Sequence, residues 1–281
     1  MTARGCLLLC WTLCASAIVA LPGLSADVAA QVSPTTKPAA QIRTWISQLG
    51  DADSAVREKA RDQLMLLGVD DLPTIRRIVE EQGATMKPGQ KTYLQDVVFQ
   101  LFLSGLEYEP DTMPAGEVLG LLPPIVLDPQ TGLAIPGPKP KPRPIPFLGL
   151  SWPPDGTDFT SETDTGVLVA RRIRGFAAYR TLRDGDIIRA IVEAPNATLS
   201  SNRELSAVIS HFNVGQTVHF KVLRNGEAIE VPVTLVARPR EVVTMNIDQW
   251  LQVREDRATE YWMQNFQPLF KDDPAPATQQ P

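Results

Sequence analysis

The sequence predicts a multidomain α+β protein, with a small bundle of helices first and a β-rich domain after it. Apolar residues recur at helical spacing across residues 41–106, whereas residues 147–240 contain short apolar strands separated by glycine turns. Many of the 25 prolines fall between these two regions. A chain of 281 residues is long enough for two domains of ordinary size.

Residues 1–30 have the pattern of a signal peptide. Arg4 provides the positive start, residues 6–21 form an uncharged apolar run, and Val28-Ala29-Ala30 offers small side chains for cleavage. We therefore expect export to the periplasm or the extracellular space, with no membrane span after cleavage. An uncleaved N-terminal anchor is the alternative, although the run is shorter than the roughly 20 residues that a spanning helix needs.

Cysteine usage and charge exclude several classes of protein. The three cysteines, Cys6, Cys10 and Cys14, all lie in the predicted signal peptide. A cleaved chain would have no thiol, which excludes a disulfide framework, a cysteine-ligated metal and a cysteine nucleophile. The net charge of −5 indicates no basic face, so we expect no nucleic-acid partner.

Residues 41–106 predict a small helical bundle. Ile42, Ile46 and Leu49 share one face of a first helix, and the capping cluster at 51–54 begins a second, which we expect Gly68 to cap. Further helices are predicted from residue 72 and over 91–106. This succession resembles about one and a half HEAT-type repeats, which implies a bundle of repeat-like ancestry because a solenoid needs several repeats.

The segments around the two domains differ in composition. Residues 31–40 and 269–281 are polar and proline-containing, and we predict that both are disordered. Residues 107–146 form a proline-rich linker, in which 138–146 favours an extended polyproline II spacer; a ligand for a proline-recognising domain is the alternative. Residues 246–268 predict a C-terminal amphipathic helix.

The β-rich region carries a characteristic order of short motifs. Leu148-Gly149-Leu150 is a glycine-containing loop before a strand, and Asp184-Gly185-Asp186 is a turn. A helix start at Ser200-Ser201 and a hairpin turn at Asn225-Gly226 follow. In this order the motifs resemble a bacterial PDZ domain of the HtrA/Deg-protease type, here without the protease domain. The resemblance implies a partly open β-barrel of five to six strands with two helices.

The resemblance also implies a binding site. In this family an extended peptide adds itself as a strand to the edge of the sheet. The loop at 148–150 would receive a terminal carboxylate on its N–H groups, and the helix after Ser201 would form the opposite wall of the groove. For each site residue, a plain core role is the alternative. The expected peptide-binding residues are Phe147, Leu148, Gly149, Leu150, Trp152, Leu205, Val208 and Phe212.

We predict no catalysis. The two histidines, His211 and His219, both lie in the PDZ-like region, and the sequence has no Gly-x-Ser-x-Gly turn for a nucleophile. The carboxylates of Asp184 and Asp186 indicate a structural turn in this family, so we expect no metal and no cofactor.

Three functional hypotheses follow. The first is an exported, non-catalytic adaptor or scaffold of the bacterial cell envelope that binds protein C-termini or extended peptides. The second is a regulatory partner of a separate envelope protease. The third is a structural PDZ fold whose groove is occluded by its own flanking segments.

Overall fold

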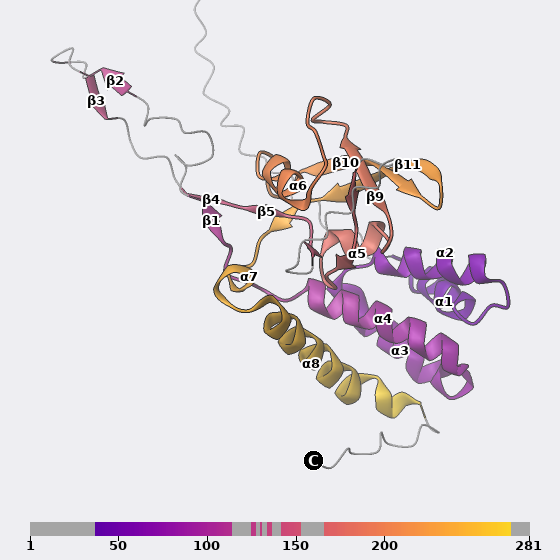
Figure 1. Cartoon of the computed structure of the whole chain (residues 1–281). Coiled ribbons are helices and arrows are strands. Elements are labelled where there is room, and N and C mark those ends of the chain that lie inside the picture. The colour runs from indigo at the N-terminus through magenta and orange to yellow at the C-terminus, as the bar shows by residue number, and fades with distance from the viewer. Residues whose placement is uncertain are drawn as a thin grey trace, which may run out of the picture. The chain divides into compact units, whose positions relative to one another are not determined.

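The computed structural model describes residues 37–113, 125–127, 130, 134–136, 142–152 and 166–270. Helices come first and open β-sheets follow, so the α+β class holds (Figure 1). All described residues belong to one compact unit, Thr35–Pro281. The predicted signal peptide lies outside the described residues, as do most of the segment 31–40, residues 153–165 and residues 271–281.

The N-terminal part consists of four α-helices whose starts follow the capping residues. Asp53 accepts a hydrogen bond from the N–H of Ala55 at 2.9 Å, which satisfies an otherwise unpaired donor at the start of the second helix. Pro73 and Pro88 lie in the first turns of the third and fourth helices, where a missing N–H costs nothing. The helices are α1 (Ala39–Gln48), α2 (Ser54–Met65), α3 (Leu72–Gln82) and α4 (Pro88–Ser104), with 3₁₀ turns at Val69–Asp71 and Gly83–Thr85.

Gly68 does not cap the second helix as expected. Its φ is −101°, so it is extended and precedes the short turn Val69–Asp71. Its N–H donates to the carboxylate of Asp71 at 3.0 Å. The helix already ends at Met65, and Leu66 keeps a right-handed conformation.

A long C-terminal helix, α8 (Ile247–Asn265), packs along α4 (Figure 1). Ala258, Trp262 and Phe266 of this region belong to the same buried core as the four N-terminal helices. Phe270 falls in the segment predicted to be disordered, yet it is buried and stacks on Trp262 with 5.7 Å between ring centroids. The helical core is therefore built from both ends of the chain.

The β-rich part contains one four-stranded sheet, in the order β11-β10-β9-β7. The hairpin of its two long strands turns at Asn225-Gly226, where both residues have positive φ, as the sequence predicts. Within the described residues the sheets are open, and they form no closed barrel. These strands are β7 (Val167–Leu168), β9 (Ile187–Ile191), β10 (Thr217–Arg224) and β11 (Glu227–Thr234).

Short paired strands and three helices complete the β-rich part. The pairs are β6 (Leu150–Ser151) with β8 (Arg171–Arg172), and β5 (Pro146–Phe147) with β12 (Val236–Ala237). The strands β2 (Ile125–Leu127) and β3 (Ala134–Pro136) form a separate hairpin. The helices are α5 (Ala177–Thr181), α6 (Asn202–Ile209) and the short α7 (Glu241–Thr244), and a 3₁₀ turn follows α8 at Gln267–Leu269.

The two ends of the predicted proline-rich linker lie side by side. Strand β1 (Thr112–Met113) pairs with β4 (Arg143–Pro144), so Met113 is opposite Arg143. The N–H of Asp111 also donates to the carbonyl of Arg238 at 2.7 Å. The two described ends of the linker therefore lie together. They do not hold two domains apart as a spacer would.

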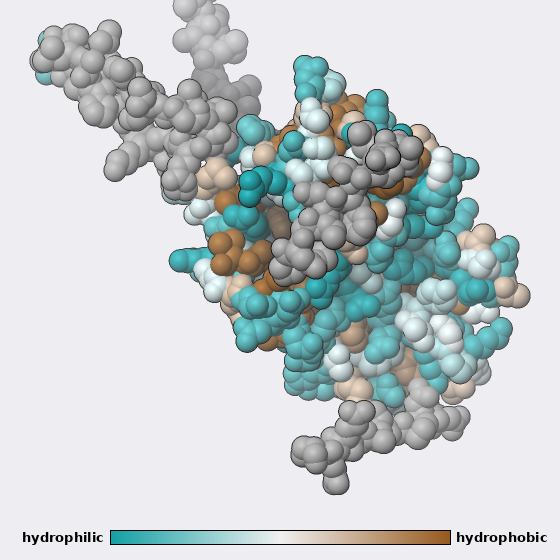
Figure 2. All heavy atoms as spheres, in the orientation of Figure 1, coloured by the Kyte–Doolittle hydropathy of each residue, from teal (hydrophilic) through white to brown (hydrophobic). Residues whose placement is uncertain are grey.

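The surface over the helices is mostly hydrophilic on the face drawn in Figure 2. Hydrophobic side chains gather at the left of that view, in the area where α7 and the strand β5 lie in Figure 1. Val243 of α7 is 59% exposed. Among the described helices, none is long and apolar enough to cross a membrane.

Candidate functional site

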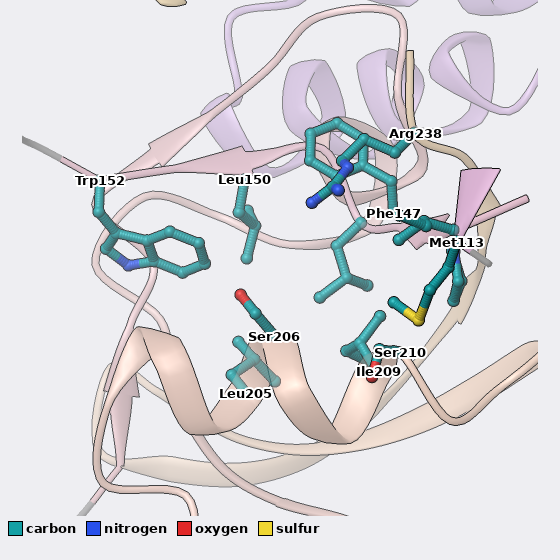
Figure 3. A pocket seen from close by; sticks show the side chains of 12 residues that line it. Met113, Phe147, Leu150, Trp152, Leu205, Ser206, Ile209, Ser210 and Arg238 are labelled. Atoms are coloured by element: carbon teal, nitrogen blue, oxygen red, sulfur yellow. The ribbon is translucent and has the colours of Figure 1, made fainter. Parts of the chain in front are cut away.

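A hollow of about 190 Å³ lies between α6 and the segment that runs through β5 into β6 (Figure 3). Figure 3 shows Trp152 and Met113 at opposite ends of this hollow, with α6 along one side. The lining is largely apolar, as in most sites that bind ligands through side-chain contact. It consists of Met113, Ile145, Pro146, Phe147, Leu148, Leu150, Trp152, Leu205, Ser206, Ile209, Ser210 and Arg238.

Most of the expected site residues meet at this hollow. Five of them line it: Phe147, Leu148, Leu150, Trp152 and Leu205. Gly149 lies in the loop between two lining residues and has a φ of +82°, a conformation that favours glycine.

Val208 and Phe212 lie outside the lining. Both are half-buried and pack against the core of the β-rich part. The helix turns Ile209 toward the hollow instead, because it lies four residues, or about one turn, after Leu205. Ser206 and Ser210 border the hollow on the same face of the helix.

Sequence reasoning missed the residues that close one end of the hollow. Met113 comes from β1, and Arg238 follows β12, so the two are far apart in the sequence and meet only through the pairing of the linker ends. No local pattern around either residue indicates a binding role.

The peptide planes of the glycine loop are held from one side. The carbonyl of Leu148 accepts from the N–H of Ala178 at 3.1 Å, and the carbonyl of Gly149 accepts from Ile173 at 2.8 Å. In a trans peptide the N–H points opposite to the C=O. The N–H groups of Gly149 and Leu150 therefore point away from residues 173–178.

The N–H groups of Leu148 and Gly149 donate to no acceptor among the described residues, so both are available to a ligand. Successive backbone N–H groups without an acceptor can form a concave site for an anion such as a carboxylate. This arrangement suits the C-terminal carboxylate of a peptide, bound at the glycine loop beside the hollow.

Strand β6 presents a free edge beside the loop. It pairs with β8 on one edge, and in the part of the chain that the structure describes no strand pairs with its other edge. The indole N–H of Trp152 donates to the carbonyl of Leu168 at 3.0 Å, which fixes the ring at the far end of the hollow. An unpaired edge between a helix and a glycine loop can accept an extended peptide as a further strand.

Arg238 borders the hollow, with its charge paired to Asp111. Its Nε and Nη2 atoms donate to one carboxylate oxygen of Asp111 at 2.9 and 2.5 Å. Figure 3 shows its side chain on the same side of the hollow as Phe147 and Leu150, across from α6. Arg143 donates to the carbonyl of Ser210 at 2.6 Å, which satisfies a carbonyl at the end of α6.

Helix α6 itself is capped as the sequence predicts. The hydroxyl of Ser201 accepts from the N–H of Glu204 at 3.2 Å, and the carboxylate of Glu204 accepts from the N–H of Ser200 at 2.7 Å. The hydrogen bonds that the carboxylate accepts from the N–H and the hydroxyl of Ser200 lower the pKa of Glu204, because they favour its charged form. The reciprocal pair fixes the start of the helix that forms one wall of the hollow.

The other candidate groups have structural partners. Asp186 is buried and accepts two hydrogen bonds from Arg224, at 2.8 and 2.7 Å, while Asp184 pairs with Arg172. His219 bonds to the carboxylate of Glu193 at 2.6 Å, a contact that raises the pKa of the imidazole. Among the described residues, no group of three or more acidic, histidine or cysteine side chains is arranged to hold a metal.

Comparison with known proteins finds similarity among solved structures. No family model matches the sequence, and no curated protein matches it. Two solved structures, both of the HtrA-type protease AlgW with a decapeptide and one of them a serine-to-alanine variant, are 26% identical to this chain over 34% of its length. The match covers 30% of each of those chains with a TM-score of 0.28. The similarity is thus local to one part of an HtrA-type protease and carries no conclusion about fold or activity by itself.

Proposed function

We propose that this chain is an exported, non-catalytic protein of the bacterial cell envelope, in which a PDZ-type domain binds the free C-termini of other proteins. The observation that carries the proposal is the hollow between α6 and the free edge of β6, with the unpaired N–H groups of Leu148 and Gly149 at one end. A peptide that pairs with β6 in antiparallel fashion would end at this loop, with its last side chain in the apolar hollow.

Two features favour a chain end over an internal segment. Met113, from the paired strands β1 and β4, lies at the end of the hollow opposite Trp152 (Figure 3), where it would meet a chain that continued past the hollow. Arg238 adds a guanidinium whose Nη1 atom donates to no other described residue, so it can attract a carboxylate. A bound peptide with a blocked terminus would leave the Nη1 group of Arg238 and the loop N–H groups without an acceptor.

Adaptor activity fits the environment of the two histidines. The Nδ1 atom of His211 lies 2.8 Å from the carbonyl of Ala207, and Nδ1 of His219 lies 2.6 Å from the carboxylate of Glu193. Neither of these bonds joins an imidazole to a serine or threonine hydroxyl, the pair that nucleophilic catalysis needs. A chain that binds without cleaving can hold client proteins or deliver them to another envelope protein.

The experiment is a selection from a library of decapeptides with random C-terminal residues, using the full-length chain as bait. We expect selected free-acid peptides with an apolar last residue and a dissociation constant on the order of micromolar. The same peptides with an amidated C-terminus should bind at least roughly tenfold more weakly. A library that yields no binder would refute the proposal, and equal binding of the amides would refute recognition of the chain end.

Export is tested separately. A chain with a C-terminal tag should be recovered from the periplasm or medium of a bacterial host, and its N-terminal residue should be Gln31 if Val28-Ala29-Ala30 directs cleavage. Recovery of the uncleaved chain in the membrane fraction would support the N-terminal anchor. Recovery in the cytoplasm would contradict export.

A further inference from the structure

We infer that Gln100 of α4 and Arg254 of α8 are positioning residues for the glycine loop at 148–150, so that the helical part of the chain sets the affinity of the groove. The ligand of the groove comes from the proposed function. The contacts that join the helices to the loop do not depend on that proposal. The link runs through residues 174–176, which lie between the helices and the loop.

Phe176 supports the glycine loop directly. A β-carbon at Gly149 would meet the side chain of Phe176, so the ring leaves no space behind the loop. Phe147 also contacts the Phe176 ring edge-on, with 5.2 Å between centroids. The backbone bonds from Ile173 and Ala178 to the loop carbonyls lie on either side of Phe176. The position of Phe176 therefore decides where the loop N–H groups point.

Side chains of α4 and α8 bond to the backbone of residues 174–176. The N–H of Gly175 donates to Oε1 of Gln100 at 2.6 Å, and Nε2 of Gln100 makes a longer bond to the carbonyl of Phe176 at 3.5 Å. Arg254 donates to the carbonyl of Arg174 at 2.5 Å. Gln100 is fully buried, so no water can replace its bond to Gly175. Each of these backbone groups thus has a fixed partner on α4 or α8.

Arg254 also holds the ring of Phe176. Its guanidinium lies 4.9 Å from the Phe176 centroid and 4.7 Å from that of Trp250, so it is stacked between rings of two elements. Burial lowers the pKa of Arg254 to about 10, and its Nη1 atom has no hydrogen-bond partner among the described residues. Burying a cation without a carboxylate partner costs free energy. The contacts of Arg254 with the Phe176 ring and the Arg174 carbonyl offset part of that cost, so they hold both groups in place.

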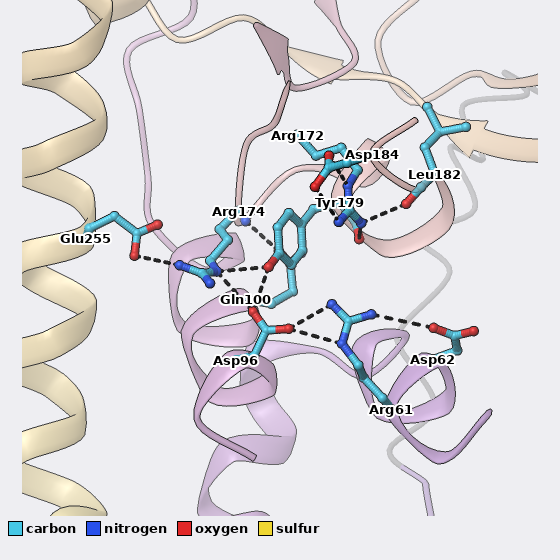
Figure 4. A network of polar contacts seen from close by, with 11 residues as sticks. Arg61, Asp62, Asp96, Gln100, Arg172, Arg174, Tyr179, Leu182, Asp184 and Glu255 are labelled. Atoms are coloured by element: carbon cyan, nitrogen blue, oxygen red, sulfur yellow. Dashed lines mark hydrogen bonds and ion pairs between the residues drawn. The ribbon is translucent and has the colours of Figure 1, made fainter. Parts of the chain in front are cut away.

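An ion network fixes the same segment from a second direction (Figure 4). Arg174 donates to Asp96 of α4 at 3.0 Å and to Glu255 of α8 at 2.8 Å. The hydroxyl of Tyr179 donates to Asp96 at 2.6 Å. Because α4 and α8 both contribute, a movement of either helix would move residues 174–176.

The consequence for binding is one of preorganisation. A loop that already points its N–H groups at the ligand loses little freedom on binding, whereas a loosened loop must be ordered first. By linkage, a peptide in the groove would in turn stabilise the packing of residues 174–176 on α4 and α8. Helices α4 and α8 would then affect the affinity of the groove, although no side chain of either helix lines the hollow.

The test compares Gln100→Leu, which removes both bonds, with Gln100→Glu, which keeps an acceptor for the N–H of Gly175. Ile75→Ala is the matched control, because Ile75 is fully buried in the helical core and lies on α3, for which no hydrogen bond or ion pair with residues 173–178 is found among the described residues. Affinity for a selected free-acid decapeptide is measured on the full chain at a temperature where near-ultraviolet circular dichroism shows each variant folded. The amide resonance of Gly149 is followed in the same samples without peptide.

We expect Gln100→Leu to weaken binding about tenfold and to move the Gly149 amide resonance, while Gln100→Glu restores both toward wild type. Ile75→Ala should change neither. Wild-type affinity and an unmoved resonance in Gln100→Leu would overturn the inference, as would an equal effect of Ile75→Ala. If Gln100→Leu does not fold, Arg254→Gln tests the same link from α8. If the wild type binds no peptide, the proposed function fails, and the resonance alone decides the positioning role.

Discussion

The side chain of Phe176 occupies the space that a β-carbon on Gly149 would need. Gly149 also has a φ of +82°, so two independent constraints require glycine at this position. The loop that we propose to receive a peptide terminus is therefore formed by packing from behind as well as by its own backbone.

Gly149→Ala should lower the free energy of unfolding by about 3 kcal/mol, because the methyl group adds a clash with Phe176 to the cost of a positive φ. Denaturant unfolding of the full chain measures the change. Gly185→Ala is the matched control: its φ is +92°, but a β-carbon there meets nothing within 4 Å. The control should cost only about 1 kcal/mol. Equal losses in the two variants would show that Phe176 does not fill the space.

Arg238→Gln should weaken binding of a free-acid decapeptide roughly three- to tenfold and leave the amidated peptide unaffected, because only the carboxylate uses the charge. Isothermal titration at two salt concentrations measures both. Arg240→Gln is the control, since Arg240 is exposed and pairs with Glu109 outside the lining of the hollow. A similar loss for the amidated peptide would mean that Arg238 acts through the fold and not through the ligand charge.

Asp96→Asn should destabilise the chain by about 2–3 kcal/mol, because it leaves Arg61 and Arg174 without their shared carboxylate in a largely buried place. Asp62→Asn, at a more exposed ion pair with Arg183, should cost less than about 1 kcal/mol. Chemical denaturation of both variants provides the comparison, and a loss at Asp96 no larger than at Asp62 would show that the network adds little.

The effect of Asp96 should depend on pH. Burial opposes its charged form, but the hydrogen bond from Tyr179 and the charges of Arg61 and Arg174 outweigh this and lower the pKa of Asp96. A lowered folded-state pKa stabilises the protein fully above the unfolded value of about 3.9, and the contribution is lost as the pH falls through the folded value. The difference in unfolding free energy between wild type and Asp96→Asn should therefore shrink in acid. A difference that stays constant from about pH 7 to about pH 3 would contradict this pH dependence.

His219 and Glu193 form an exposed pair with a predictable titration. The hydrogen bond that the imidazole donates to the carboxylate of Glu193 raises the pKa of His219. The stability that this pair contributes is therefore present below about pH 6.5 and is lost as the pH rises through the folded value. Glu193→Gln should return the pKa of His219 toward about 6.5, as measured by NMR titration of the ring protons. An unchanged pKa of His219 in Glu193→Gln would contradict this cause.

Local signals predict much of the fold. The helix starts at Asp53 and Ser201 and the turn at Asn225 follow from side-chain capping and from glycine conformation, which act within a few residues. The C-terminal helix follows from its aromatic side, and that side includes Arg254, which the structure buries.

The groove could be predicted only in part. Along α6 and the turn after it, the apolar residues Leu205, Val208, Ile209 and Phe212 form one stripe, and spacing alone does not tell which edge of the stripe faces the core and which the hollow. Arg238 pairs with Asp111 across 127 residues, a contact that only the pairing of the linker ends creates. The support of the loop by Gln100 is equally non-local, so no sequence pattern indicates it.

The central claim is that a peptide terminus binds on the N–H groups of the glycine loop, and an NMR titration of the full chain with a selected free-acid decapeptide tests it most directly. We predict that the amide resonances of Leu148, Gly149 and Leu150 shift most, together with those of the α6 residues that line the hollow. The amidated peptide should not shift the loop amides at the same concentration. Binding that leaves the resonances of all three loop amides unchanged would contradict the account.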